Sequence, residues 1–182
     1  MTPTNEIVTK TASELAALYR RRELSPLEVT RALLAWIERH EPAVNAFARL
    51  DIEGALAGAA RSEQRFASAT PLGELDGVPV SIKDLIDVRG LPTRMGSRTT
   101  TAASAEQDAP VVARLREQGA VLLGKSTTSE FGLKGLGVSP LTGTTRNPWD
   151  VSRSSGGSSA GAVASVAAGF NPIAIGTDGG GS

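Results

Sequence analysis

The sequence predicts an α/β protein, and three observations lead to this fold class. From residue 71 onward, short apolar runs alternate with segments of helical periodicity, which is typical of α/β architecture. Residues 1–70 instead carry helix-start signals, so we expect an N-terminal helical layer there. Residues 154–182 enclose a small-residue helix and an apolar strand between two clusters of glycine and serine, an arrangement that flexible linkers do not show.

Two helix starts are marked in the N-terminal part. Thr11 and Glu14 form a capping-box pattern, and the helix that it opens should run to about residue 22. Ser25 repeats this logic with a proline at the first helical position, and its helix should end near Pro42. A short strand over 45–50 and an alanine-rich helix over 51–67 are expected to follow.

The second part should supply most of the sheet. Apolar runs predict strands over 78–82, 120–123 and 172–175, and helical patterns predict helices over 108–118, 125–132 and 160–168. A polar loop should connect residue 132 with the glycine-rich stretch. Lys83 then lies at the carboxyl end of the first of these strands.

Composition narrows the classes of function. The chain has 182 residues with 19 basic and 19 acidic side chains, so its charge does not indicate a nucleic acid as partner. The sequence has no cysteine and a single histidine, His40, which argues against thiol, His-triad and multi-histidine metal chemistry within it. It contains neither a membrane-spanning apolar run nor a signal-peptide pattern. We expect a cytoplasmic protein that uses no metal and no organic cofactor.

Two short motifs suggest other chemistry. Residues 119–126 match the phosphate-binding pattern G-x-x-x-x-G-K-[ST], but a helical pattern precedes Gly119 and the middle residues are strand-like, which favours a plain helix–turn–strand. Residues 157–161 match G-x-S-x-G, which would make Ser159 the nucleophile of an α/β-hydrolase. That chemistry needs a histidine after the serine, and none follows within this sequence.

Three segments, in order and at defined distances, carry a family resemblance. Residues 156–161 read GGSSAG and residues 177–182 read TDGGGS, which places Ser158 and Ser182 24 positions apart. Upstream, residues 76–84 read DGVPVSIKD, and their Lys83 precedes Ser158 by 75 positions. With these motifs the chain resembles the amidase signature family, whose members hydrolyse or transfer amide bonds. The likeness covers nearly the whole chain.

The resemblance implies a mixed central sheet flanked by helices on both faces, with residues 71–182 as the first part of the amidase core. It implies a catalytic triad of Lys83, Ser158 and Ser182, with a cis peptide bond before Ser158. A serine hydroxyl is a weak nucleophile that needs a base, and a desolvated lysine can serve because burial disfavours its charged form. The remaining site residues are an oxyanion hole at Gly179, Gly180 and Gly181, and supporting residues Ser159, Thr177 and Asp178.

The favoured interpretation is an amidase that hydrolyses carboxylic amides of small molecules through an acyl-enzyme. Two alternatives stay open: the amidase subunit of a tRNA-dependent amidotransferase, and a non-catalytic binding protein with the same fold. Because members of the family are much longer, we interpret the chain as the N-terminal part of an enzyme, truncated at the nucleophile Ser182. Homo-oligomerisation is compatible with the sequence, which does not decide it.

Overall fold

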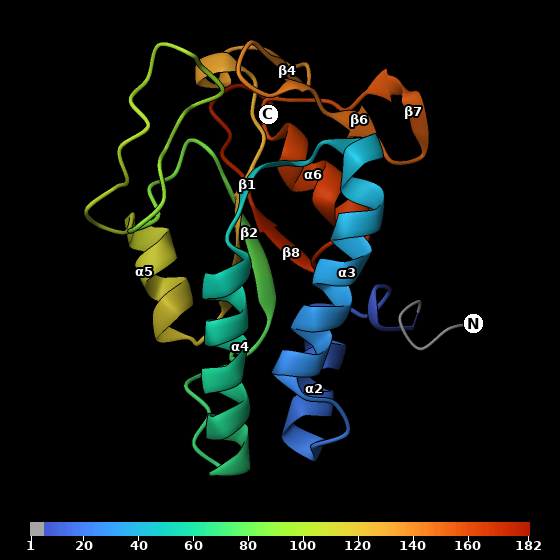
Figure 1. Ribbon diagram of the computed structural model, residues 1–182, viewed down its shortest axis with the longest axis vertical. Helices are drawn as coiled ribbons and strands as arrows, with labels where there is room; N and C mark the ends of the chain where they lie inside the picture. Colours follow the sequence, from blue (N-terminus) through green and yellow to red (C-terminus); the bar gives the residue numbers. More distant parts are fainter. Residues whose placement is uncertain (1–5) are drawn as a thin grey trace.

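The central element is a four-stranded mixed sheet with helices on both faces (Figure 1), as expected. The computed structural model describes residues 6–182, so residues 1–5 of the expected helical layer lie outside the described part. The strand order is β1 (Phe47–Leu50), β3 (Val121–Ser126), β2 (Pro79–Lys83) and β8 (Ile173–Ile175). β1 runs antiparallel to β3, whereas β2 runs parallel to both of its neighbours.

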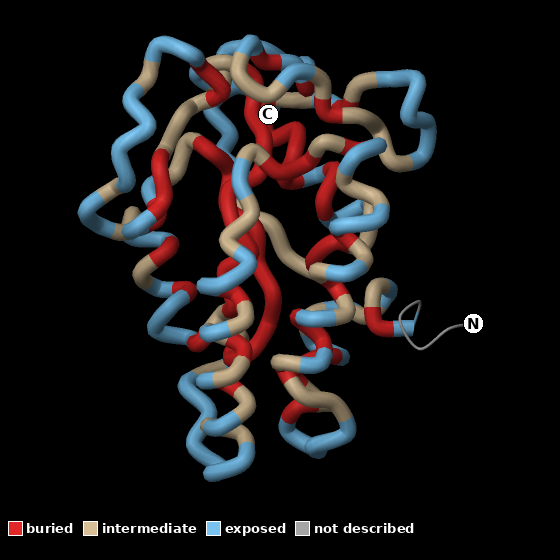
Figure 2. The backbone as a smooth tube through the Cα atoms, viewed as in Figure 1, coloured by how far each residue is buried: buried red, intermediate tan, exposed pale blue. Residues whose placement is uncertain are grey.

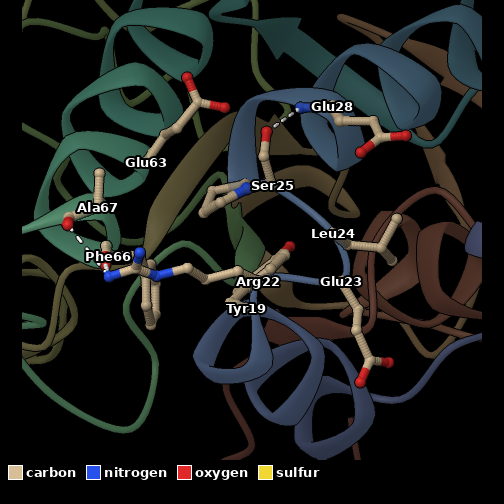
Figure 3. Close-up of a pocket in the computed structure, with 10 residues that line it drawn as sticks. Tyr19, Arg22, Glu23, Leu24, Ser25, Glu28, Glu63, Phe66 and Ala67 are labelled. Atoms are coloured by element: carbon tan, nitrogen blue, oxygen red, sulfur yellow. Dashed lines mark hydrogen bonds between the residues drawn. The ribbon is translucent and has the colours of Figure 1, made fainter. Parts of the chain in front are cut away.

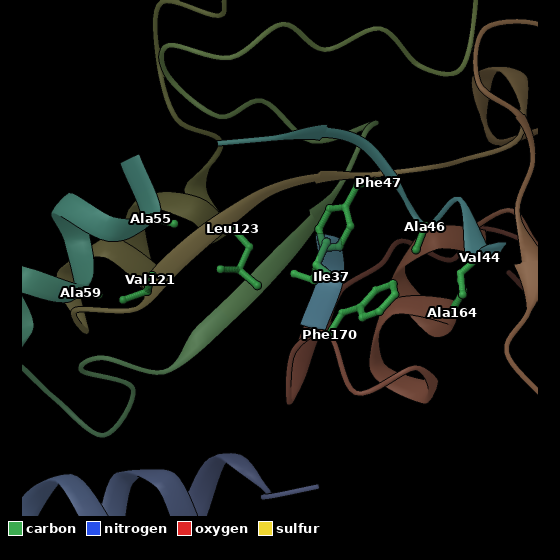
Figure 4. Packing of buried hydrophobic residues seen from close by; sticks show 10 residues of the cluster. All are labelled: Ile37, Val44, Ala46, Phe47, Ala55, Ala59, Val121, Leu123, Ala164 and Phe170. Carbon is green, nitrogen blue, oxygen red and sulfur yellow. The ribbon is translucent and has the colours of Figure 1, made fainter. Parts of the chain in front are cut away.

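The sheet buries side chains on both faces because successive strand residues point to opposite sides. On one face, Val121 and Leu123 of β3 pack with α3 (Pro26–Val44), α4 (Ile52–Ala67) and α6 (Ala160–Ala167), as Figure 4 shows. On the other face, Val80 and Ile82 of β2 pack against α5 (Pro110–Glu117). Leu15 and Tyr19 of α2 (Ala12–Arg21) join a buried cluster with Leu33 of α3. The Tyr19 ring also contacts the Phe66 ring of α4.

The N-terminal helices begin where the capping signals predict. The Thr11 side chain accepts from the Glu14 N–H while Glu14 accepts from the Thr11 N–H, which confirms the capping box. α3, however, ends at Val44 rather than near Pro42. The proline lies in the last turn, and Asn45 ends the helix in a left-handed conformation. The Glu41 carboxylate fixes the residues that follow, because it accepts the N–H groups of Ala46 at 3.0 Å and Phe47 at 2.6 Å.

The expected helix over 125–132 is wrong. β3 continues through Ser126, because Lys125 pairs with β1 on one side and with β2 on the other. Of that segment, only Glu130–Gly132 turns into a short 3-10 helix, η1. The pattern at residues 119–126 therefore forms a turn and strand, as favoured above, and its lysine is fixed in the sheet.

The segment expected as a polar loop contains two small hairpins. β4 (Val138–Ser139) pairs with β5 (Gly143–Thr144), and β6 (Arg146–Asn147) pairs with β7 (Asp150–Ser154). α6 and β8 then follow within a residue or so of their expected bounds.

Packing crosses the expected boundary at residue 70. β1 belongs to the first part of the sequence but pairs with β3 of the second. Figure 2 shows β2 as a buried segment at the centre of the molecule, and all five of its residues are buried. Within residues 6–182, no helix has the length and apolar character to cross a membrane.

Candidate active site

The site is built around Lys83, at the carboxyl end of β2. Its side chain is fully buried, with a relative exposure of 0%. Ser81, two residues earlier on the same face, lies 3.2 Å (Oγ–Oγ) from Ser165 of α6. Because side chains two residues apart share a face of the strand, Lys83 also points to the side of α6, towards the loop that precedes this helix.

Three hydroxyl groups meet the lysine amine there. Lys83 Nζ lies 2.8 Å from Ser158 Oγ, and Ser158 Oγ lies 2.8 Å from Ser182 Oγ. Ser159 Oγ lies 2.9 Å from both Lys83 Nζ and Ser182 Oγ. The peptide bond between Gly157 and Ser158 is cis, as the resemblance implied. The structure thus brings the predicted lysine and serines together, with Ser159 closer to the centre than a supporting residue would need to be.

Lys83 is surrounded by acceptors, but no carboxylate of residues 6–182 is in contact with it. Besides the three serines, Thr177 Oγ1 at 2.9 Å and the Thr177 carbonyl at 3.3 Å accept from Nζ. Burial lowers the pKa of Lys83, and the nearby charge of Asp178 opposes this shift to a smaller extent. A lowered pKa favours the neutral amine, which is the form that can accept a proton.

Asp178 holds the turn that carries Ser182. One oxygen, Oδ1, accepts the backbone N–H groups of Gly180 at 2.9 Å, Gly181 at 2.5 Å and Ser182 at 2.9 Å. These hydrogen bonds keep the pKa of the Asp178 carboxyl below its usual value. Among the predicted oxyanion-hole donors, the N–H groups of Gly180 and Gly181 are therefore engaged, whereas that of Gly179 makes no hydrogen bond to the described residues.

A cavity of about 360 Å³ opens beside the serines, between the loop 131–135 and the turn 179–182. Phe131 and Leu133 contribute exposed apolar side chains to it, at relative exposures of 45% and 83%. A second cavity of about 310 Å³ lies between α2, α3 and α4, away from the site (Figure 3). Its Ser25 caps α3, and its Arg22 donates to the carbonyl groups of Phe66 and Ala67.

The sequence interpretation missed one polar group beside the site, the ion pair of Asp84 and Lys125 (Nζ–Oδ1 3.1 Å), whose side chains are 2% and 1% exposed. The only signal in the sequence was Lys125 in the phosphate-binding pattern of residues 119–126, and this pattern did not indicate that the lysine pairs with a carboxylate. In the described part of the chain, no group of three or more His, Cys, Asp or Glu side chains could hold a metal ion.

The fold and the site together describe an α/β protein with a lysine–serine cluster at the carboxyl edge of its sheet. Residues 28–182 match the family model "Amidase", and the chain belongs to the amidase family.

Two curated relatives carry the same name, that of a glutamyl-tRNA(Gln) amidotransferase subunit. The chain is 46% identical over 178 residues to the protein of Acidothermus cellulolyticus, an alignment that covers 98% of this chain and 35% of that protein. It is 42% identical over 177 residues to the protein of Salinispora arenicola, covering 97% and 36%. The chain thus spans about a third of the length of the curated relatives that it matches.

Solved structures agree with the family assignment. The peptide amidase of Stenotrophomonas maltophilia superposes with a TM-score of 0.85 at 33% identity, covering 91% of this chain and 35% of that chain. A bacterial aryl acylamidase of the amidase signature family superposes with a TM-score of 0.84 at 30% identity, covering 91% and 34%.

Proposed function

We propose that this chain carries the Ser–Ser–Lys catalytic centre of an amidase that hydrolyses carboxylic amides through an acyl-enzyme. The observation that carries the proposal is the position of Ser158 Oγ, which lies 2.8 Å from Lys83 Nζ and 2.8 Å from Ser182 Oγ. A hydroxyl group placed between an amine and a second hydroxyl can pass a proton from one to the other. This arrangement would convert Ser182 into a nucleophile without a histidine.

In the first step, Ser182 Oγ attacks the carbonyl carbon of the amide. Its proton moves to Ser158 Oγ, and the Ser158 proton moves to neutral Lys83 Nζ, which becomes an ammonium. Collapse of the tetrahedral intermediate breaks the C–N bond, and the same relay returns one proton to the leaving nitrogen. Water then attacks the ester carbon, the relay runs again, and the products are a carboxylic acid and free Ser182.

The oxyanion of this reaction needs donors that point at it. The Gly179 N–H is free among the described residues, and those of Gly180, Gly181 and Ser182 are assembled in one turn by Asp178. We assign the oxyanion hole to this turn, with Gly179 as the donor available without rearrangement. The other donors must first turn away from Asp178.

The test is labelling of the complete protein with a fluorophosphonate, followed by intact mass and peptide mapping. One adduct at Ser182 is expected, together with release of ammonia from primary amides. Lys83→Ala and Ser158→Ala should each slow both reactions by roughly a hundred- to ten-thousand-fold, as for other positioned proton-transfer groups. Ser154→Ala, a serine of β7, is the matched control and should leave both unchanged. Unaltered turnover in Lys83→Ala would refute the Ser–Ser–Lys triad. A folded complete protein that forms no adduct and releases no ammonia would favour the binding-protein alternative.

A second candidate function rests on the names of the relatives. Proteins named as a subunit of glutamyl-tRNA(Gln) amidotransferase match 97–98% of this chain at 42–46% identity. A subunit of that kind would deliver ammonia within an assembly instead of acting alone. Affinity purification of the tagged complete protein from its own cells distinguishes the two, because only the subunit should bring stoichiometric partners with it. The cytoplasmic location and the lack of a nucleic-acid partner remain predictions.

A further inference from the structure

The Asp84–Lys125 ion pair lies on the opposite face of the sheet from Lys83 and is not used by the proposed mechanism. Asp84 directly follows Lys83, and its N–H donates to the Ser126 carbonyl at 3.0 Å, which continues the pairing of β2 with β3. Because side chains alternate along the strand, Lys83 points towards α6 while Asp84 points away and meets Lys125. Both charges are buried, so each depends on the other for compensation.

The pair ties a neighbouring segment, residues 92–97, to the end of the sheet. Lys125 Nζ donates to Thr93 Oγ1 at 2.9 Å and to the Pro92 carbonyl at 3.4 Å. The Arg94 N–H donates to Asp84 Oδ1 at 3.3 Å, and the Met95 N–H donates to the Asp84 carbonyl at 3.0 Å. The ion pair is therefore the common anchor of this segment.

The same segment holds the loop that lines the cavity beside the serines. The Phe131 N–H donates to the Met95 carbonyl at 2.8 Å, and Ser97 Oγ donates to Glu130 Oε1 at 2.7 Å. Between these contacts Gly96 approaches closely, since a Cβ there would lie 2.7 Å from the Thr128 carbonyl oxygen. Residues 131–135 then form one wall of the cavity that Ser158 and Ser182 share.

We infer that Asp84 and Lys125 are positioning residues that set the binding wall 131–135 through the segment 92–97. They act on the affinity of the site for its ligand more than on the nucleophile, because Lys83, Ser158 and Ser182 contact each other on the other face. This inference rests on the proposed function.

The experiment uses an alkyl fluorophosphonate and separates its binding constant KI from the rate of covalent attack, kinact, in the complete protein. Lys125→Met should raise KI about tenfold and change kinact much less, the pattern of lost binding rather than lost chemistry. Thr93→Val removes the hydrogen bond from Lys125 Nζ to Thr93 Oγ1 and leaves the ion pair intact, so it should also raise KI. This variant replaces Lys125→Met in the test if Lys125→Met does not fold.

The matched control is Arg65→Met, which breaks the pair with buried Asp76 (2.6 Å) beyond the amino end of β2. Arg65→Met should lower the free energy of unfolding but leave KI for the fluorophosphonate unchanged. Hydrogen exchange over residues 129–136 should rise in Lys125→Met and not in Arg65→Met. Unchanged KI and unchanged exchange in a folded Lys125→Met protein would overturn the inference, as would an equal rise of KI in Arg65→Met. Wild-type protein that is not labelled at Ser182 would instead count against the proposed function, while the exchange measurement still tests the positioning role.

Discussion

At Lys83, an ionisable amine is buried without contact to any carboxylate in the described part of the chain. Five oxygen atoms surround Nζ, more than the three protons of an ammonium can serve, and the geometry is equally suited to a neutral amine that accepts from Ser158. Lys125, on the neighbouring strand, has its Asp84 partner and stays paired. Two buried lysines on neighbouring strands of the sheet thus have different electrostatic surroundings, which supports our proposal that Lys83 is the base.

This difference predicts a pH dependence. Burial lowers the pKa of Lys83 from its usual value of 10.5. Labelling by the fluorophosphonate should therefore rise with pH as the ammonium loses its proton, and level off above the pKa of Lys83 in the folded protein. Asp178→Asn removes a carboxylate that raises this pKa, so its midpoint should move to lower pH. Asp150→Asn, in the exposed β6–β7 hairpin, is the control. A midpoint that moves upward in Asp178→Asn would contradict the assignment.

At the scale of elements, α6 holds the two serines that precede it at the site because the start of this helix packs closely against the ends of β1 and β3. A Cβ at Gly161 would overlap the Ala46 carbonyl oxygen and the Thr127 N–H group. Gly161→Ala should therefore force the helix outwards and destabilise the protein by about 1–3 kcal/mol, as overpacked cores do. Because Ser158 and Ser159 precede this helix, the same change should slow labelling of Ser182.

The control for this prediction is a second helical glycine. At Gly58 of α4, an added Cβ would find its nearest atoms at 3.9 and 4.0 Å, which is ordinary contact. Gly58→Ala should therefore stabilise the protein by about 0.5–1 kcal/mol through helix propensity and leave labelling unchanged. Thermal or urea unfolding measures both variants. Gly161→Ala with wild-type stability and labelling would show that α6 has room to adjust.

The elements also show which parts of the fold could be read from the sequence. Local signals at Thr11 and Ser25 predicted the helix starts because a cap is a contact within one turn. The end of β3 is determined by its pairing with β1 and β2, which are distant in the sequence. No local pattern therefore indicated that Lys125 belongs to a strand. Lys83, Ser158 and Ser182 are also distant from one another in the sequence, and they could be predicted because three motifs resemble those of a known family. No such resemblance indicated the Asp84–Lys125 pair, which forms across two strands.

For the whole molecule, the sheet has two edge strands among the described residues, β1 and β8. β8 pairs with β2 on one side alone, so the other side of its backbone offers hydrogen-bonding groups to any further strand. Beside it, α6 exposes Val163 and Val166, at relative exposures of 56% and 42%. These groups border a cavity of about 550 Å³ between α6 and β8. An open edge next to apolar side chains is a surface that favours association.

We therefore expect the polypeptide 1–182, expressed by itself, to self-associate through the β8 edge. The double variant Val163→Lys/Val166→Lys places charges beside that edge at positions that are already partly exposed, so it should reduce association without unfolding the protein. Ile52→Lys is the matched control, because Ile52 of α4 is 50% exposed and lies outside that cavity. Light scattering over a range of concentrations measures the outcome. A wild-type polypeptide that stays monomeric throughout, with a cooperative thermal transition, would mean that β8 is protected by its own short length and that these residues form an autonomous unit.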